Sequence, residues 1–176
     1  MQSLHLRRGI AALAIACLLL FDAGAAIAAT PNYLPNAKAT PGLINPLVTQ
    51  KNIHSTICVS GYSKLIRPLS SYTTKLKIQQ LSSLPYSRYG SRNTRLFEED
   101  HLISLELGGN PTSSLNLWPE PFAGPYGARI KDKLENKLHD LVCSGQLGLV
   151  AAQQAEASNW YAAYLTYVVG TSAKQP

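Results

Sequence analysis

The 176 residues of this chain suffice for one domain of ordinary size after removal of a leader, and we expect no separate recognition domain among them. Only 15% of the residues are charged, so we expect a surface built largely from Ser, Thr, Asn and Tyr. The formal net charge of +6 favours an anionic partner such as nucleic acid, although a mild excess of this size also serves solubility alone.

Residues 1–28 have the three parts of a secretory signal peptide. Arg7 and Arg8 give a basic start, and an apolar run follows over residues 10–21. The triplet Ala26-Ile27-Ala28 has the small-x-small pattern of a cleavage site, so removal is expected near Ala28 or Ala29. The run is short for a membrane span. We therefore predict a secreted or periplasmic protein with no stable membrane insertion after leader removal; an uncleaved membrane anchor is the alternative.

The chain has three cysteines, and Cys17 lies in the leader. A lipoprotein anchored at Cys17 is disfavoured because this residue lies inside the apolar run. Cys58 and Cys143 remain as a pair, and an oxidising compartment predicts a disulfide between them. Closing so long a loop is worth about 4–5 kcal/mol of chain entropy. Neither residue has a second cysteine within four positions, which disfavours a cysteine-based metal site.

The first half of the mature chain predicts an arm, a strand and a helix. Residues 29–52 carry four prolines and no helical period, so we expect an extended, poorly structured arm on the domain surface. Residues 53–60 alternate apolar and polar positions, which favours a short strand. A helix with Leu76 and Leu81 turned inward is expected over residues 70–84, followed by a loop over 85–94.

The second half predicts a strand, a Gly-rich loop, a short strand and then helices. The stretch 94–107 has β-favouring residues at Leu96, Phe97, Leu102 and Ile103, and Gly108 and its neighbours end it. Residues 113–119 are short and extended. A helix over 127–143 follows, with Gly145 as its stop. Its apolar stripe consists of Ile130, Leu134, Leu138, Leu141 and Val142. A last helical region covers roughly 147–168, with a break near Ser158.

Three short motifs in this region, Asp100-His101, Gly108-Gly109 and Asn116-Leu117, are spaced as in a known nuclease superfamily. The chain resembles the HNH or ββα-metal nucleases, and more loosely a group of small exported bacterial proteins that carry this module. The resemblance implies an α+β fold with a ββα-metal (HNH-like) core, flanked by the N-terminal arm and C-terminal helices and stapled by one disulfide. The HNH-like domain would cover residues 53–170.

The resemblance also implies roles for three residues. His101 corresponds to the general base, which takes a proton from water, and Asp100 to a ligand of a divalent cation, Mg²⁺ or Mn²⁺. Asn116 would position the imidazole or brace the loop. Because neighbours on a strand point to opposite sides, a twist or bulge is needed if Asp100 and His101 are to meet.

The third metal ligand is expected on the helix over 127–143. Asp132, Glu135 and His139 fall on one flank of that helix, and Glu135 lies nearest its apolar stripe, so Glu135 is the first choice. The alternative is a solvated helix face on which Glu135 and His139 form an i,i+4 pair.

Other residues near the motif have weaker assignments. Arg88, Arg92 and Arg95 are candidates for phosphate contacts, with an ordinary basic loop as the alternative. The three glutamates near the motif, Glu98, Glu99 and Glu106, are expected on the surface, although Glu99 could reach a cation. Trp118 is expected in the core.

The sequence thus predicts a metal-dependent endonuclease that hydrolyses phosphodiester bonds in DNA or RNA with low sequence specificity. Two alternatives stay open. One is a non-catalytic exported binding module that retains the ββα scaffold, and the other is an envelope protein whose disulfide-stapled helices bind a protein partner.

Overall fold

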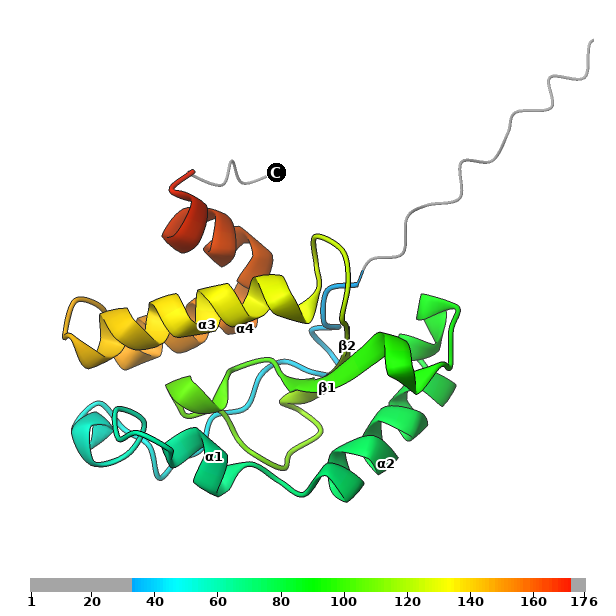
Figure 1. Ribbon diagram of the computed structural model, residues 1–176, viewed down its shortest axis with the longest axis horizontal. Helices are drawn as coiled ribbons and strands as arrows, with labels where there is room; N and C mark the ends of the chain where they lie inside the picture. Colours follow the sequence, from blue (N-terminus) through cyan, green and yellow to red (C-terminus); the bar gives the residue numbers. More distant parts are fainter. Residues whose placement is uncertain (1–32, 172–176) are drawn as a thin grey trace, which may run out of the picture. The chain divides into compact units, whose positions relative to one another are not determined.

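The computed structural model describes residues 33–171, which contain four α-helices and one two-stranded antiparallel sheet besides short 3-10 turns and loops (Figure 1). The helices are α1 (Tyr62–Ile66), α2 (Ser70–Ser82), α3 (Ala128–Cys143) and α4 (Leu149–Tyr164), and the strands are β1 (Phe97–His101) and β2 (Leu117–Pro121). The predicted α+β class is confirmed, whereas the predicted leader lies outside the described residues.

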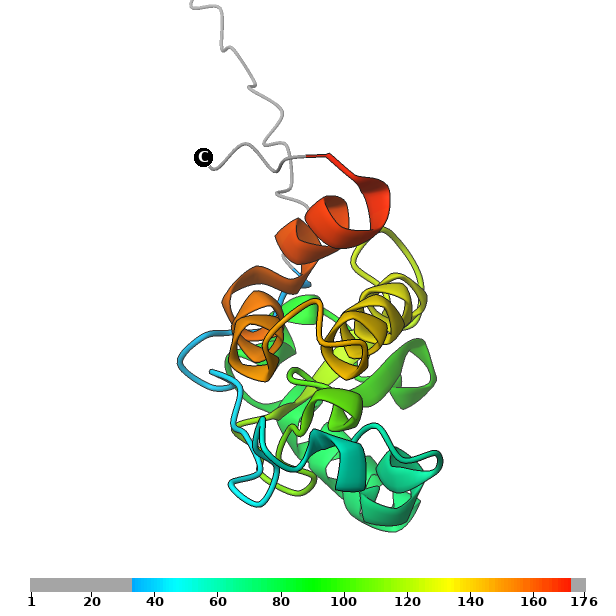
Figure 2. The ribbon, with the colours of Figure 1, turned by 90° about the vertical axis from the view of Figure 1, so that its left-hand side faces the viewer.

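The sheet lies between helices on both of its faces. On one side α2 packs against both strands, and on the other side α3 and α4 lie side by side (Figures 1 and 2). The pairing runs from Phe97 opposite Pro121 to His101 opposite Leu117 without interruption. Fully buried side chains from the sheet and the helices form the core: Trp118, Leu134, Leu138, Val142 and Trp160. Trp118 therefore has the core position expected of it.

The helices follow the sequence pattern closely. The predicted helices over 70–84 and 127–143 are confirmed as α2 and α3, and Gly145 just beyond α3 takes a left-handed φ of +74°. The expected break in the last helix is at Asn159, whose φ of −166° and ψ of 88° are not helical. After α4 the chain continues as a π-helical turn over Leu165–Val169.

The strand predicted over residues 53–60 is wrong. This segment forms a 3-10 helix over Ile53–Ser55 and then turns. Ile53 and Ile57 are both buried, while Val59 is 47% exposed. Ile53 and Ile57 are four residues apart, a spacing that places both on one side of a helical turn and also on one face of a strand. The apolar pattern therefore did not distinguish the two structures.

The first strand of the motif is shorter than predicted, because β1 ends at His101. Beyond it the main-chain groups of Ile103 bind the side chain of Asn116, and the amide of Ser104 donates to a carboxylate oxygen of Glu156 at 2.7 Å. Side chains thus take the hydrogen bonds that a longer ladder would need. A 3-10 turn over Leu105–Leu107 then leads into the glycines.

The described part of the arm, residues 33–52, contributes to the core rather than only covering it. Val48 is buried in the main apolar cluster, and Ile44 pairs with Gly109 in an isolated antiparallel bridge. The amide of Gly42 donates to the carbonyl of Leu115 at 2.9 Å. The prediction of a poorly structured surface arm is therefore corrected for these residues.

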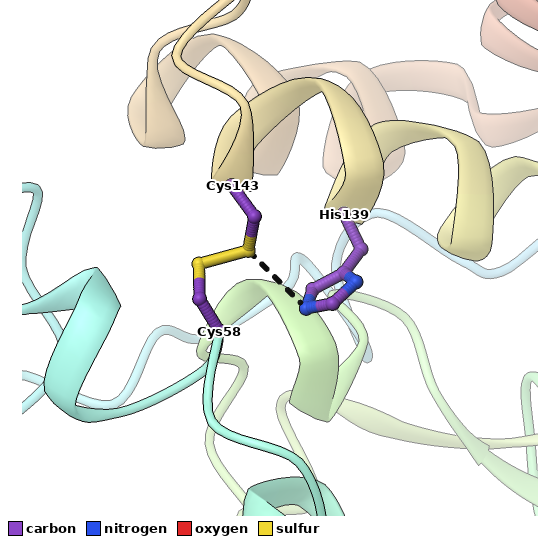
Figure 3. Close-up of side chains that lie close together, drawn as sticks. All are labelled: Cys58, His139 and Cys143. Carbon is purple, nitrogen blue, oxygen red and sulfur yellow. Dashed lines mark hydrogen bonds between the residues drawn. A yellow bond between two sulfur atoms is a disulfide. The ribbon is translucent and has the colours of Figure 1, made fainter.

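The predicted disulfide joins Cys58 to Cys143, with the two Cα atoms 5.7 Å apart. It ties the turn after residue 57 to the last residue of α3 (Figure 3). Within residues 33–171, no helix has both the length and the apolar character needed to cross a membrane.

Candidate active site

Asp100 and His101 are neighbours on β1, and their side chains leave the strand toward opposite faces. His101 lines a cavity beside α2, whereas Asp100 accepts a hydrogen bond from Lys131 of α3. The pairing of β1 with β2 is one to one along its whole length, so no bulge turns either side chain. The two groups therefore follow ordinary strand alternation and do not converge.

The imidazole of His101 is held in one tautomer. Its Nε2 atom lies 2.9 Å from the carbonyl oxygen of Pro111, in the loop between the strands. A carbonyl only accepts, so Nε2 carries the proton and Nδ1 of the neutral ring keeps a lone pair. Burial lowers the pKa of His101, and the nearby Asp100 carboxylate only partly offsets this. The ring is therefore neutral near pH 7, as a general base must be.

Asn116 braces the loop between the strands. Its Oδ1 atom accepts from the amides of Ile103 at 2.9 Å and Leu43 at 3.4 Å. Its Nδ2 atom donates to the carbonyls of Ile103 and Asn110, both at 3.0 Å. The amide contacts only main-chain groups in these bonds, so of the two roles left open by the sequence the geometry corresponds to the brace.

The Gly-Gly pair has a geometric reason at each position. Gly108 takes a φ of +74°, in the left-handed region where side chains are strained. At Gly109 an added Cβ would lie 1.8 Å from the carbonyl oxygen of Ile103 and 2.7 Å from Nδ2 of Asn116. The brace made by Asn116 thus requires glycine at position 109.

A buried lysine occupies the place where a cation was expected beside Asp100. The Nζ atom of Lys131 donates to Oδ2 of Asp100 at 2.9 Å, to the carbonyl of His101 at 2.7 Å and to Oε1 of Glu135. These three bonds use all the hydrogens of the ammonium. Burial lowers the pKa of Lys131, but the carboxylates of Asp100 and Glu135 outweigh it and hold the pKa well above its ordinary value.

The carboxyl groups around Lys131 have different charge states. Burial raises the pKa of Asp100, but Lys131 and His101 outweigh it, so Asp100 titrates below its ordinary value. Burial raises the pKa of Glu135 to about 7 despite the adjacent ammonium. Glu120 and Glu156 are fully buried, and burial raises both of their pKa values well above the ordinary value.

The predicted metal ligands are divided among three places. Asp100 and Glu135 both bind Lys131. Asp132 lies 3.6 Å from Arg129 on the exposed side of α3. The Nε2 atom of His139 is 3.0 Å from the carbonyl oxygen of Ile57 and 3.4 Å from the sulfur of Cys143. Glu135 pairs with Lys131 and not with His139, the partner it would have on the alternative, solvated helix face.

This donor set does not fit the divalent cation that the resemblance implies. The two carboxylates that come together already neutralise an ammonium, and the other two predicted ligands lie elsewhere. Among residues 33–171, the one group of three potential ligands close enough to share an ion is Cys58, His139 and Cys143, and its sulfurs form the disulfide.

The cavity beside His101 has a volume of about 340 Å³ and combines charges of both signs. Arg67 and Lys77 line it together with Glu98 and Glu99. Glu99, expected on the surface, is only 8% exposed, and neither of its carboxyl oxygens has a hydrogen-bond partner. Burial raises its pKa to about 8, which Lys77 only partly counteracts.

The arginines predicted to contact phosphate lie elsewhere. Arg88, Arg92 and Arg95 are exposed, and none of them lines the cavity of His101. The cations that do line it, Arg67 and Lys77, come from the end of α1 and from α2. No motif marked either residue in the sequence.

Sequence reasoning also missed Lys131, Glu120 and Glu156. For Lys131 a signal was present, because residues 131, 134, 138 and 142 share one helical stripe and all four are buried. Glu120 lies between two prolines of β2, and Glu156 belongs to a helix with no clear apolar face, so neither had a comparable signal.

Comparison of this chain with protein-family models, with curated proteins and with solved structures finds no match.

Proposed function

We propose that this chain hydrolyses phosphodiester bonds in nucleic acid, with little sequence preference, in the cavity lined by His101. One observation carries the proposal: a neutral imidazole, mounted on a strand and held in one tautomer, shares a cavity with two cationic side chains. A strand is a rigid mount for a catalytic group, and cations beside it suit a phosphate.

In the proposed reaction, His101 takes a proton from a water molecule as the water oxygen bonds to phosphorus. The bond from phosphorus to the leaving nucleotide oxygen then breaks, and solvent supplies the proton for that oxygen. Arg67 and Lys77 offset the negative charge that grows on the phosphate oxygens. Asn116 holds the loop whose Pro111 carbonyl orients the imidazole.

The requirement for Mg²⁺ or Mn²⁺ stays a prediction of the resemblance. The predicted ligands do not gather into one site, so the proposed step uses the side chains of this chain alone. A chelator then separates two forms of the proposal, because loss of cleavage would show that a cation is needed in addition to Arg67 and Lys77.

A non-catalytic exported binding module is the second candidate. The specific observation in its favour is the ammonium of Lys131, which fills the place of the expected cation and neutralises the carboxylates beside it. Such a module would bind nucleic acid through the cavity cations without cutting it.

The test mixes the purified chain with plasmid DNA and with RNA, with and without chelator. The proposal expects cleavage that falls by about 10²–10⁴-fold in His101→Ala, the usual cost of losing a general base. His54→Ala is the matched control, since His54 is exposed and outside the cavity. Binding without cleavage across several divalent metals would favour the module.

Export belongs to the same proposal. The disulfide is typical of an oxidising compartment, and residues 1–28 have the pattern of a leader. Cell fractionation should find the chain outside the cytoplasm and shortened by about the length of that segment; a full-length cytoplasmic chain with free thiols would contradict it.

A further inference from the structure

The disulfide has a histidine at its side. His139 lies one helical turn before Cys143 on α3, and its Nε2 atom is 3.4 Å from the Cys143 sulfur (Figure 3). Potential ligand atoms of Cys58, His139 and Cys143 all lie within 4.8 Å of one another. While the sulfurs are bonded to each other, neither is a thiolate, so the oxidised group cannot hold an ion.

One distance in this group already fits a zinc site. Zinc bonds of about 2.3 Å to sulfur and about 2.0–2.1 Å to nitrogen, at tetrahedral angles, place those ligands about 3.6 Å apart. The observed 3.4 Å between nitrogen and sulfur is close to this value. The same geometry requires the two sulfurs to lie about 3.8 Å apart. They can reach this distance once the disulfide is broken.

We propose that reduction of the disulfide creates a zinc site formed by Cys58, His139 and Cys143, with water in the fourth position. Two small-molecule thiols supply two electrons and two protons to the disulfide and leave as their own disulfide. Zn²⁺ then displaces the protons of the two cysteine thiols. Thiolates with an imidazole select zinc over the Mg²⁺ or Mn²⁺ of the predicted nuclease site.

His139 changes its hydrogen bonding in this step. Its Nε2–H now donates to the carbonyl of Ile57 at 3.0 Å. On zinc binding, Nε2 becomes the ligand atom, the ring keeps its one proton on Nδ1, and the bond to Ile57 is lost. All three side chains are partly exposed, so a reductant and an ion can both reach them.

The consequence is a brace with two chemical forms. The end of α3 stays joined to the turn at Cys58 by a covalent bond when oxidised, and by zinc when reduced. Because α3 also carries Lys131, which contacts the carbonyl of His101, the brace would keep the candidate active site assembled in both redox states.

The experiment uses the full chain with Cys17→Ser, so that Cys58 and Cys143 are the only cysteines left. Cobalt(II) replaces zinc as a spectroscopic probe and is titrated into the oxidised chain and into the chain reduced by a phosphine. We expect one cobalt per reduced chain, with thiolate charge-transfer bands and the intense d–d bands of tetrahedral coordination, and none of these bands in the oxidised chain.

Variants identify the ligands. His139→Ala should weaken cobalt binding at least about 10-fold. Substituting even a residue that only hydrogen-bonds to a metal ligand usually lowers metal affinity 10–100-fold. His54→Ala, at an exposed histidine, should bind as the parent does. Cys58→Ser with Cys143→Ser lacks the disulfide as the reduced chain does, but it lacks the thiolates too, so it should not bind.

Folding of the reduced chain is followed in the same samples by near-ultraviolet circular dichroism and thermal unfolding. Zinc should raise the unfolding midpoint of the reduced chain, or restore its signal if reduction unfolds it, and should leave the double serine variant unchanged. Equal cobalt binding by oxidised and reduced chains, or binding by His139→Ala as tight as by the parent, would overturn the proposal. Neither result bears on nuclease activity, which is measured separately.

Discussion

The ammonium of Lys131 donates a hydrogen bond of 2.7 Å to the main-chain carbonyl of His101, the last residue of β1. The same ammonium binds Asp100 and Glu135. One buried side chain therefore fixes the end of the strand against α3 and neutralises the charge around it. The main chain that carries the candidate general base depends on this contact.

Replacing Lys131 by methionine should destabilise the fold strongly. The change leaves the carboxylates of Asp100 and Glu135 without their cation, and breaking a buried pair from one side costs about 3–5 kcal/mol. Chemical unfolding of Lys131→Met measures the loss. Lys133→Met, on the exposed side of the same helix, should change the unfolding free energy by less than about 0.5 kcal/mol. Equal stability of the two variants would show that the ion pairs contribute nothing net.

Asn116→Ala should loosen the loop between the strands. The substitution removes four hydrogen bonds to main-chain groups and leaves the buried amide and carbonyl of Ile103 unpaired. Each buried unpaired group costs about 1–3 kcal/mol, so we expect a loss of several kcal/mol in the unfolding free energy. Hydrogen exchange of residues 102–116 should rise. Asn136→Ala, at an exposed position on α3, is the control and should alter neither quantity.

Periodicity was enough to predict α2, α3, the stop at Gly145 and the break in α4, because each depends on local residue choice. It failed at residues 53–60, where Ile53 and Ile57 suit either period. It also predicted a first strand longer than β1. The side chains of Asn116 and Glu156, which are distant in the sequence, take the hydrogen bonds that would extend the strand pairing. Such contacts leave no local signal.

At the candidate site, the motif indicated residues that the structure does place around one loop. Asn116 and Gly109 fit together there, and the carbonyl of Pro111 orients His101. The predicted ligand set was not brought together, because helix geometry showed which residues share a flank of α3 but not what that flank faces. Lys131 is the decisive omission, since a lysine is seldom expected on a buried stripe.

The stability of the chain should depend on pH through Glu99. Burial raises the pKa of this carboxyl from an ordinary 4.5 to about 8 in the fold, so the folded chain holds a proton that the unfolded chain releases. The contribution of Glu99 to the free energy of unfolding is greatest below pH 4.5. It decreases as the pH rises and no longer changes above about pH 8.

Glu99→Gln removes that titration while keeping the shape of the side chain. At pH 4 the variant and the parent should unfold alike, and at pH 8 the variant should be more stable on the order of a few kcal/mol. Unfolding free energies measured across this range give the comparison. Glu106→Gln makes the same change outside the cavity and should retain the slope of the parent. Parallel curves for Glu99→Gln and the parent would show that Glu99 is ionised in the fold.

Removing the disulfide should cost about 4–5 kcal/mol, the chain-entropy value for two cysteines 85 positions apart. The double variant Cys58→Ala with Cys143→Ala, unfolded in denaturant without reductant and with zinc chelated, measures this loss. A loss below about 1 kcal/mol would mean that the unfolded chain keeps the two segments together without the bond.

Nuclease activity of His101→Gln tests the central claim most directly. Glutamine can still donate a hydrogen bond to the carbonyl of Pro111, which keeps the loop contact. Its amide nitrogen is not basic, so it cannot take a proton from water. We predict cleavage of plasmid DNA or RNA by the parent, unchanged cleavage by the control His54→Ala, and a loss of about 10²–10⁴-fold in His101→Gln with an unaltered unfolding midpoint. Cleavage by His101→Gln at the rate of the parent would contradict the account.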